Sequence, residues 1–169
     1  MKPISRDHDL YKVFSELVEG SLPEHASDAP EVQVYLTDLL ARFVHTDGVF
    51  AIRKDGTPVK SVIEMVAEGD VRLNADSFER EREVHRHIGD YILFWSGVYP
   101  DFLTKLRLAG LDLSCDYTEQ GRQSYHLVST FDYPPFGEEA PIFRRLSEGF
   151  EEYRHVLAEV SAKLPFYAA

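Results

Sequence analysis

Cysteine is almost absent from this chain of 169 residues, which contains only Cys115. A single cysteine cannot form a disulfide within the chain, and it cannot build a zinc site of four thiolates. A chain without internal disulfides is typical of a reducing compartment. We therefore expect the protein to be cytoplasmic.

Long apolar runs are missing as well. The first residues, MKPISRDHDLYKVF, lack the continuous apolar stretch of a secretion signal. No later segment approaches the length that is needed to span a bilayer. These absences predict a protein that has no membrane partner.

Basic residues are few compared with acidic ones. The chain has 18 Lys and Arg against 29 Asp and Glu, which gives a formal net charge of −11. Between Lys12 and Arg42 there is no Lys or Arg, but there are six acidic residues: Glu16, Glu19, Glu24, Asp28, Glu31 and Asp38. Because nucleic-acid binding draws much of its affinity from neutralising phosphates, this charge argues against a nucleic-acid partner.

Short motifs of known enzyme classes are also missing. The sequence has no glycine-rich phosphate loop and no His-Glu-x-x-His motif. Ser124 lies in GRQSYH, which is not the Gly-x-Ser-x-Gly of a nucleophile elbow. Cys115 is followed by Asp116, whose charge disfavours a thiolate, so we interpret this cysteine as a small buried or half-buried side chain.

What the sequence does contain is a strong helical period. Its length fits one domain, residues 1–169, and its composition of 44% hydrophobic and 28% charged residues is that of a globular protein. Apolar residues recur at intervals of three and four through most of the chain. The expected helices run from Leu10 to Gly20, Pro30 to near Gly48, Ser61 to Glu68, Phe78 to Gly97, Pro100 to Gly110, Asp116 to Val128 and Pro141 to Leu164.

Residues 49–62 are the least helical segment. Asp55 and Gly56 form a turn signal between two apolar stretches, which favours either an irregular loop or a minor β-hairpin. Two strands alone are only marginally stable, so such a hairpin would be an accessory element. The four or five substantial helices predict an all-α, single-domain helical bundle with additional short helices.

A polar stripe on the long helix indicates one kind of chemistry. Glu83, His87 and Asp90 share a helical face, and their side-chain types suit Zn, Mn or Fe. Glu152 and His155 on the last helix have the spacing that di-metal carboxylate bundles use twice. The second such pair is absent, and Glu and His are common on solvated helix faces. An exposed, salt-bridged face is therefore the stronger interpretation, with a metal site as the alternative.

Asp90 stands out because it precedes Tyr91–Trp95, a segment that is apolar on every side and should be central. A buried carboxylate needs partners, and Arg86, one turn earlier, is the local candidate. A Tyr hydroxyl or an Arg from another helix, such as Arg122 or Arg144, could supply further hydrogen bonds. Buried ion pairs commonly orient helices, so we expect Asp90 to have a structural role. Gly89 weakens the helix, which suggests that another backbone approaches closely at that point.

Aromatic residues are plentiful, with 11 Phe, 9 Tyr and 1 Trp. They gather near the ends of the predicted helices, where they can fill a core, form an interface or line a ligand pocket. Residues 131–136 contain two prolines that force an extended path. We expect this segment to be an aromatic lid or a plug between helices.

Three functions are compatible with these patterns. The leading hypothesis is a protein that acts by association, above all with itself as a homo-oligomer, through an amphipathic or aromatic surface. One alternative is a metal-dependent enzyme with a carboxylate and histidine site in the bundle interior. Another is a small-molecule binder with an aromatic pocket, built from Trp95, Tyr99 and Tyr125 around Asp90 or Arg122. The sequence assigns neither a catalytic residue nor a cofactor.

Overall fold

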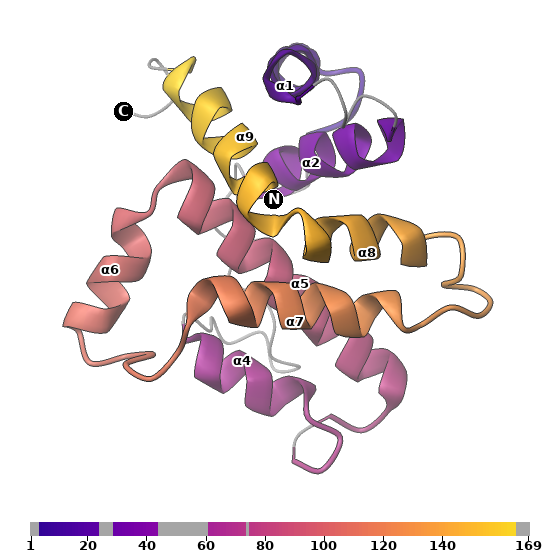
Figure 1. The fold of residues 1–169 in the computed structure, drawn as a ribbon, viewed down its shortest axis with the longest axis vertical. Helices are drawn as coiled ribbons and strands as arrows, with labels where there is room; N and C mark the ends of the chain where they lie inside the picture. The colour runs from indigo at the N-terminus through magenta and orange to yellow at the C-terminus, as the bar shows by residue number, and fades with distance from the viewer. Residues whose placement is uncertain (1–3, 24–28, 44–60, 74, 165–169) are drawn as a thin grey trace.

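The computed structural model describes residues 4–23, 29–43, 61–73 and 75–164, and these ranges are helical, with no strand among them (Figure 1). They hold eight helices: α1 Asp9–Ser21, α2 Pro30–Phe43, α4 Val62–Gly69, α5 Phe78–Val98, α6 Asp101–Leu108, α7 Tyr117–Ser129, α8 Ala140–Glu148 and α9 Phe150–Ala162. The predicted all-α class is confirmed. The single domain and the bundle of four to five main helices stay predictions. None of the helices in the described ranges is both long enough and apolar enough to cross a membrane.

Capping side chains start several helices where the sequence predicts them. Ser61, Ser77 and Asp116 each accept a hydrogen bond from the backbone N–H three residues later, at the starts of α4, α5 and α7. Such caps satisfy N–H groups that have no partner within the first turn of a helix. The three helices therefore begin within one or two residues of the predicted positions.

Two predicted segments do not match the described helices. The hairpin near residues 49–62 lies almost wholly outside the described residues, and the two that are described, Ser61 and Val62, cap and begin α4. The prediction of a single last helix from Pro141 to Leu164 is wrong, because Gly149 separates α8 from α9. A Cβ atom at Gly149 would lie 2.9 Å from the ring of Tyr153, so the close packing at this break requires glycine.

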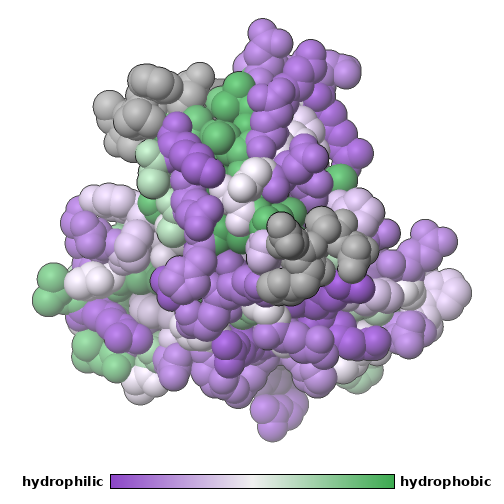
Figure 2. Space-filling model, turned by 45° about the horizontal axis from the view of Figure 1, so that its top comes forward, coloured by the Kyte–Doolittle hydropathy of each residue, from purple (hydrophilic) through white to green (hydrophobic). Residues whose placement is uncertain are grey.

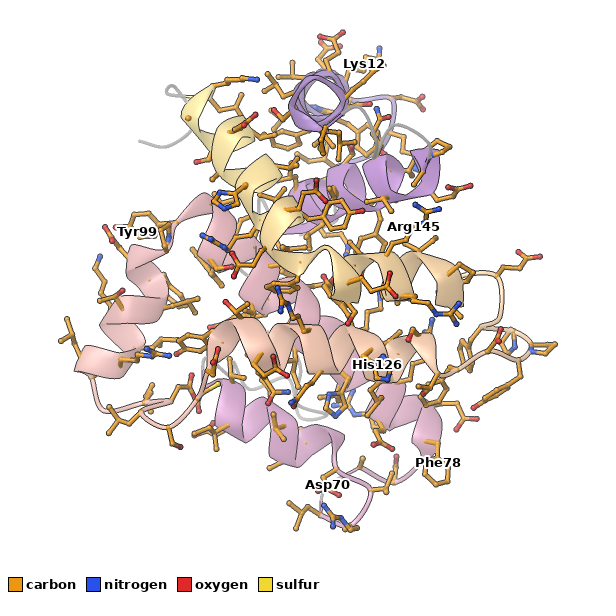
Figure 3. All side chains as sticks on the ribbon, viewed as in Figure 1. Lys12, Asp70, Phe78, Tyr99, His126 and Arg145 are labelled. Atoms are coloured by element: carbon orange, nitrogen blue, oxygen red, sulfur yellow. The ribbon has the colours of Figure 1, made fainter. Side chains whose placement is uncertain are left out.

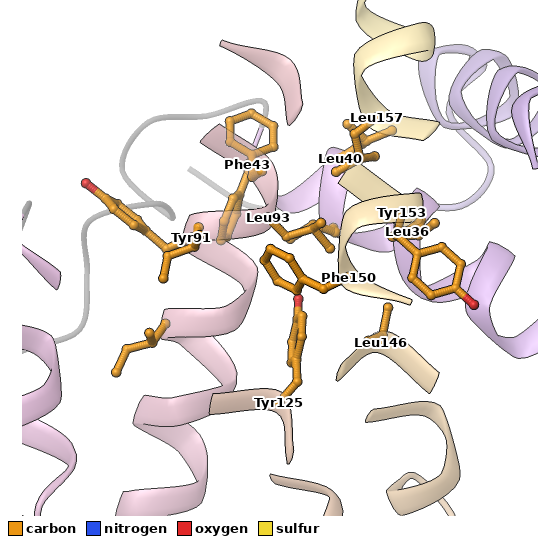
Figure 4. Close-up of a cluster of buried hydrophobic side chains, with 14 of the residues drawn as sticks. Leu36, Leu40, Phe43, Tyr91, Leu93, Tyr125, Leu146, Phe150, Tyr153 and Leu157 are labelled. Atoms are coloured by element: carbon orange, nitrogen blue, oxygen red, sulfur yellow. The ribbon is translucent and has the colours of Figure 1, made fainter. Parts of the chain in front are cut away.

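The helix α5 is the central element of the fold. Figure 1 shows α5 running through the middle of the molecule, with α7 in front of it and α4 below, and α2, α6 and α9 also contact it. In the predicted central segment Tyr91–Trp95, residues 91–94 are buried and Trp95 is half-buried. They belong to one hydrophobic core that includes side chains from all the described helices, part of which is drawn in Figure 4.

A close approach at Gly89 fixes how α7 packs on α5. A Cβ atom at Gly89 would lie 2.6 Å from the ring of Tyr125, a residue of α7. The predicted close approach is therefore real, but it is made by an aromatic side chain and not by a backbone. Gly121 plays the same part on α7, where a Cβ atom would lie 2.5 Å from the ring of Phe150.

Replacement of Gly89 tests this packing. We expect Gly89→Ala to lower the free energy of unfolding by about 1–3 kcal/mol, because the added methyl group overpacks a rigid core. Gly20 is the matched control, since it lies inside α1 and nothing lies within 4 Å of its added Cβ. Gly20→Ala should stabilise the protein by up to about 1 kcal/mol. Urea unfolding followed by circular dichroism measures both, and equal stability of Gly89→Ala and the native protein would contradict the contact.

Candidate functional site

The predicted site contains one buried carboxylate, that of Asp90, a residue that is 1% exposed. Its Oδ1 accepts hydrogen bonds from the hydroxyl groups of Tyr35, at 2.6 Å, and Tyr125, at 2.7 Å. Its Oδ2 accepts a hydrogen bond from Nη2 of Arg42 at 3.0 Å, within an ion pair. One carboxylate on α5 thus binds side chains from α2 and α7.

Local sequence explains how these donors reach Asp90. Tyr35 and Arg42 lie two turns apart on α2, so both face α5. Tyr125 can reach the carboxylate because its ring lies over Gly89. The Arg42 side chain keeps 31% of its surface exposed, which reduces the cost of desolvating its charge.

The environment keeps both phenols protonated. Burial raises the pKa of Tyr35 and of Tyr125 above the ordinary value of 10, and the negative charge of Asp90 raises it further. A neutral phenol can donate its hydrogen bond to a carboxylate, whereas a phenolate cannot. With three donors in place and almost no exposed surface, the Asp90 carboxylate is built to hold helices together.

Arg86, the predicted partner of Asp90, does not bind its carboxylate. No hydrogen bond joins Arg86 to Asp90 among the described residues, and the guanidinium carbon of Arg86 lies 6.0 Å from the centre of the Tyr35 ring. Arg42 takes the position on the carboxylate because α2 presents it directly to Oδ2. Arg86 is therefore a neighbour of the network and not the direct counter-ion of Asp90.

The other predicted pocket residues do not gather around Asp90. Trp95 stacks on a phenylalanine of α6, with ring centres 4.1 Å apart. Tyr99 lies exposed at the end of α5, and Arg122 contacts α8 through its carbonyl oxygen, which accepts a hydrogen bond. Of the aromatic candidates, only Tyr125 reaches Asp90. The aromatic pocket predicted around this carboxylate is therefore not formed by these side chains.

The five predicted metal ligands are not brought together either. Asp90 is occupied by its three donors, the ring of His87 lies against two aromatic rings, and Glu83 pairs with an arginine of its own helix at 3.4 Å. Glu152 is half-buried and His155 is exposed on α9. Within the described ranges, no three His, Cys, Asp or Glu side chains are arranged to hold a metal ion.

Sequence reasoning missed a second buried carboxylate, that of Asp112 in the link between α6 and α7. Its oxygens accept hydrogen bonds from the Ser61 hydroxyl at 2.8 Å, the Val62 and Ile63 N–H groups at 2.9 and 3.0 Å, and the Tyr117 hydroxyl at 3.0 Å. A negative charge at the N-terminus of a helix satisfies its free N–H groups and complements its dipole. Asp112 therefore fixes the start of α4.

Two nucleophile candidates are held in inactive environments. Burial, together with the charge of Asp112, raises the pKa of Cys115 to about 11, so its thiol stays protonated at neutral pH. The Ser124 hydroxyl lies 3.0 Å from Nδ1 of His85, which is the type of contact that activates a serine. Ser124 is 0% exposed, however, so a substrate has no access to it.

The surface carries a different kind of candidate, which we call the aromatic groove. It is a hollow of about 280 Å³ at the start of α5 and the end of α7, lined by Phe78, Glu81, Leu127, Thr130, Phe131 and Tyr133. Phe78 is 64% exposed and Tyr133 is 46% exposed. Figure 3 shows Phe78 at the start of α5, on the outside of the molecule. The groove therefore presents aromatic rings to solvent in a concave surface.

The wall of the aromatic groove is anchored to α5 by Arg82. The guanidinium group of this buried residue pairs with Glu139 at 2.8 Å, and its carbon lies 4.2 Å from the centre of the Phe136 ring. Phe131 packs against Phe136 and against Tyr133, with ring centres 6.0 and 5.8 Å apart. The segment predicted as an aromatic plug thus has a buried inner ring, Phe131, and an exposed outer ring, Tyr133.

Comparisons of the chain with protein-family models, with curated proteins and with solved structures found no match. On the face that Figure 2 draws, the surface is mainly hydrophilic and its hydrophobic side chains form separate patches. A second hollow, of about 300 Å³, lies between α4 and α7 and has a mixed polar and apolar lining without an aromatic ring. The aromatic groove differs from it in having three aromatic rings among its six lining residues.

Removal of single hydroxyl groups tests the Asp90 network. We expect Tyr35→Phe and Tyr125→Phe each to lower the free energy of unfolding by about 1.5–3 kcal/mol, as for other hydrogen bonds to a charged group. The control is Tyr133→Phe, which removes an exposed hydroxyl and should change stability by less than about 0.5 kcal/mol. Urea titration at neutral pH measures all three. Two buried variants as stable as the control would contradict the network.

Alkaline pH tests the same phenols through their ionisation. The unfolded chain releases these protons from pH 10 upward, whereas the folded chain retains them because the pKa of Tyr35 and Tyr125 is raised. The contribution to stability is therefore complete below pH 10 and is lost as the pH rises above it. The free energy of unfolding should fall more steeply for the native protein than for the double variant Tyr35→Phe/Tyr125→Phe. Parallel curves between pH 9 and pH 11 would refute the assignment.

Proposed function

We propose that this protein acts by association with another protein chain, and that the aromatic groove is its docking surface. The observation that carries the proposal is the exposure of Phe78 and Tyr133 around one hollow. Aromatic side chains are enriched at protein interfaces, and a concave site surrounded by a rim can exclude water from an anchor residue of the partner.

The rigidity of the groove supports a binding role. Arg82 ties the loop that carries Tyr133 to α5 through an ion pair with Glu139 and a contact with the ring of Phe136. Its guanidinium group also lies over the ring of Phe143 on α8. A surface that is ordered before binding loses less conformational entropy when a partner docks. The groove is thus suited to recognise a partner without refolding.

The buried polar groups support a structural role for the interior. The carboxylates of Asp90 and Asp112 have their hydrogen bonds satisfied by the chain itself. A buried carboxylate whose hydrogen bonds are all made within the chain has no acceptor left to bind a substrate. The proposed function therefore places recognition at the surface of a single-domain bundle of four to five main helices.

The charge of the chain bears on the kind of partner. A net charge of −11 repels nucleic acid and also a second copy of the chain. A symmetric pair formed through the groove would bring two Glu81 side chains into one interface. We therefore propose a different protein as the partner, in a cytoplasmic setting that the single cysteine favours, in place of the expected homo-oligomer.

A displayed library of random peptides tests the docking surface. Peptides selected on the native protein should bind the double variant Phe78→Ser/Tyr133→Ser about tenfold more weakly or not at all, since both anchor-contacting rings are removed. The matched control is Leu108→Ser, at a residue of α6 that is 82% exposed and outside the groove. Fluorescence anisotropy measures each affinity. Failure to select any peptide, or equal binding to the double variant, would refute the docking surface.

Sedimentation at micromolar concentration distinguishes the two kinds of partner. The native protein should sediment as a monomer. A dimer that dissociates in the double variant Phe78→Ser/Tyr133→Ser but persists in Leu108→Ser would show that the partner is a second copy.

A further inference from the structure

We infer that the aromatic groove takes a cationic side chain, an arginine or a lysine, from a segment of the partner protein. This inference rests on the proposed function and names the chemistry that the groove would recognise. It follows from the lining of the groove, from the state of one carboxylate in it and from a contact of the same kind inside the chain.

The lining of the groove is electrostatically negative. Three of its six residues are aromatic, and the faces of aromatic rings attract cations. Glu81 adds a formal negative charge, and no Lys or Arg is among the lining residues. Two more acidic side chains are adjacent in sequence and exposed, Glu79 next to Phe78 and Asp132 next to Tyr133. A cation is therefore attracted both to the rim and to the interior of the hollow.

The Glu81 carboxylate makes no direct hydrogen bond or ion pair with another described residue. It is half-buried, and it interacts electrostatically with Arg72, a largely exposed arginine that already pairs with Asp70 at 3.0 Å. The arginines that flank it on α5 are already engaged, Arg80 with Glu83 and Arg82 with Glu139. A partly desolvated carboxylate gains most from a counter-ion that arrives with a ligand.

The chain itself contains the contact that we infer for the partner. The guanidinium group of Arg82 lies over the ring of Phe136 and pairs with the carboxylate of Glu139. One ring and one carboxylate thus bind an arginine directly behind the groove wall. The groove presents the same two kinds of group, aromatic rings and Glu81, and no Lys or Arg is among its lining residues.

Short peptides that differ at one central residue test the inference. With constant glycine and serine flanks, peptides with central Arg or Lys should bind the native protein at least about tenfold more tightly than the peptide with central Leu. The peptide with central Glu should not bind. Added salt should weaken the binding of the Arg peptide, because screening acts on its charge.

Variants of Glu81 make the test specific to this carboxylate. Glu81→Gln should weaken binding of the Arg peptide about fivefold and leave the Leu peptide unchanged. The control Glu159→Gln removes the same charge from an exposed residue of α9 and should leave both peptides unchanged. Circular dichroism confirms that each variant is folded.

The outcomes separate this inference from the proposed function. If the Leu peptide binds the native groove as tightly as the Arg peptide, or if Glu81→Gln has no effect, the cationic anchor is refuted while the docking surface stands. If neither these peptides nor the displayed library binds the native protein, both proposals fail. Competition by free guanidinium ion at the concentration at which the Arg peptide competes would refute a protein segment as the source of the cation.

Discussion

The carboxylate of Asp90 is the interaction on which the arrangement of the described helices depends. It lies on the central helix α5 and receives hydrogen bonds from Tyr35 and Arg42 on α2 and from Tyr125 on α7. Taking one partner from a buried ion pair commonly destabilises a protein by about 3–5 kcal/mol, because the other charge is left unpaired. The same contact requires a glycine at position 89, since the Tyr125 ring occupies the space of a side chain. A single charge thus sets the position of two neighbouring helices and the residue type beside it.

Much of the helical structure could be predicted from the sequence, whereas the contacts between helices could not. Periodicity and caps are local signals, so the bounds of α5 and α7 agree closely with the prediction. The burial of Asp90 was predicted from the apolar segment that follows it. Its donors Tyr35, Arg42 and Tyr125 are 55, 48 and 35 residues away in the sequence. No local pattern identifies Tyr35 or Arg42 as a donor to Asp90. The two-turn spacing of Tyr35 and Arg42 on α2 is the one signal that could have suggested a shared target.

The predicted metal ligands show the limit of reasoning from one helical face. Spacing along α5 correctly places Glu83, His87 and Asp90 on related faces, but it does not specify what packs against each residue. In the fold, His87 meets aromatic rings, Glu83 meets an arginine, and Asp90 meets phenols. The aromatic groove was foreseen only in part, because residues 131–136 were singled out while Phe78, its other wall, comes from a different helix.

The capping of α4 by Asp112 affects the order in which parts of the chain can fold during synthesis. The acceptor for the first N–H groups of α4 lies about 50 residues farther along, in the link before α7. While a ribosome is still extending the chain, α4 can leave the exit tunnel long before Asp112 does, and its first turn then relies on water. Final docking of α4 therefore has to wait until the link to α7 has been translated, which makes it a late event for a segment that is made early.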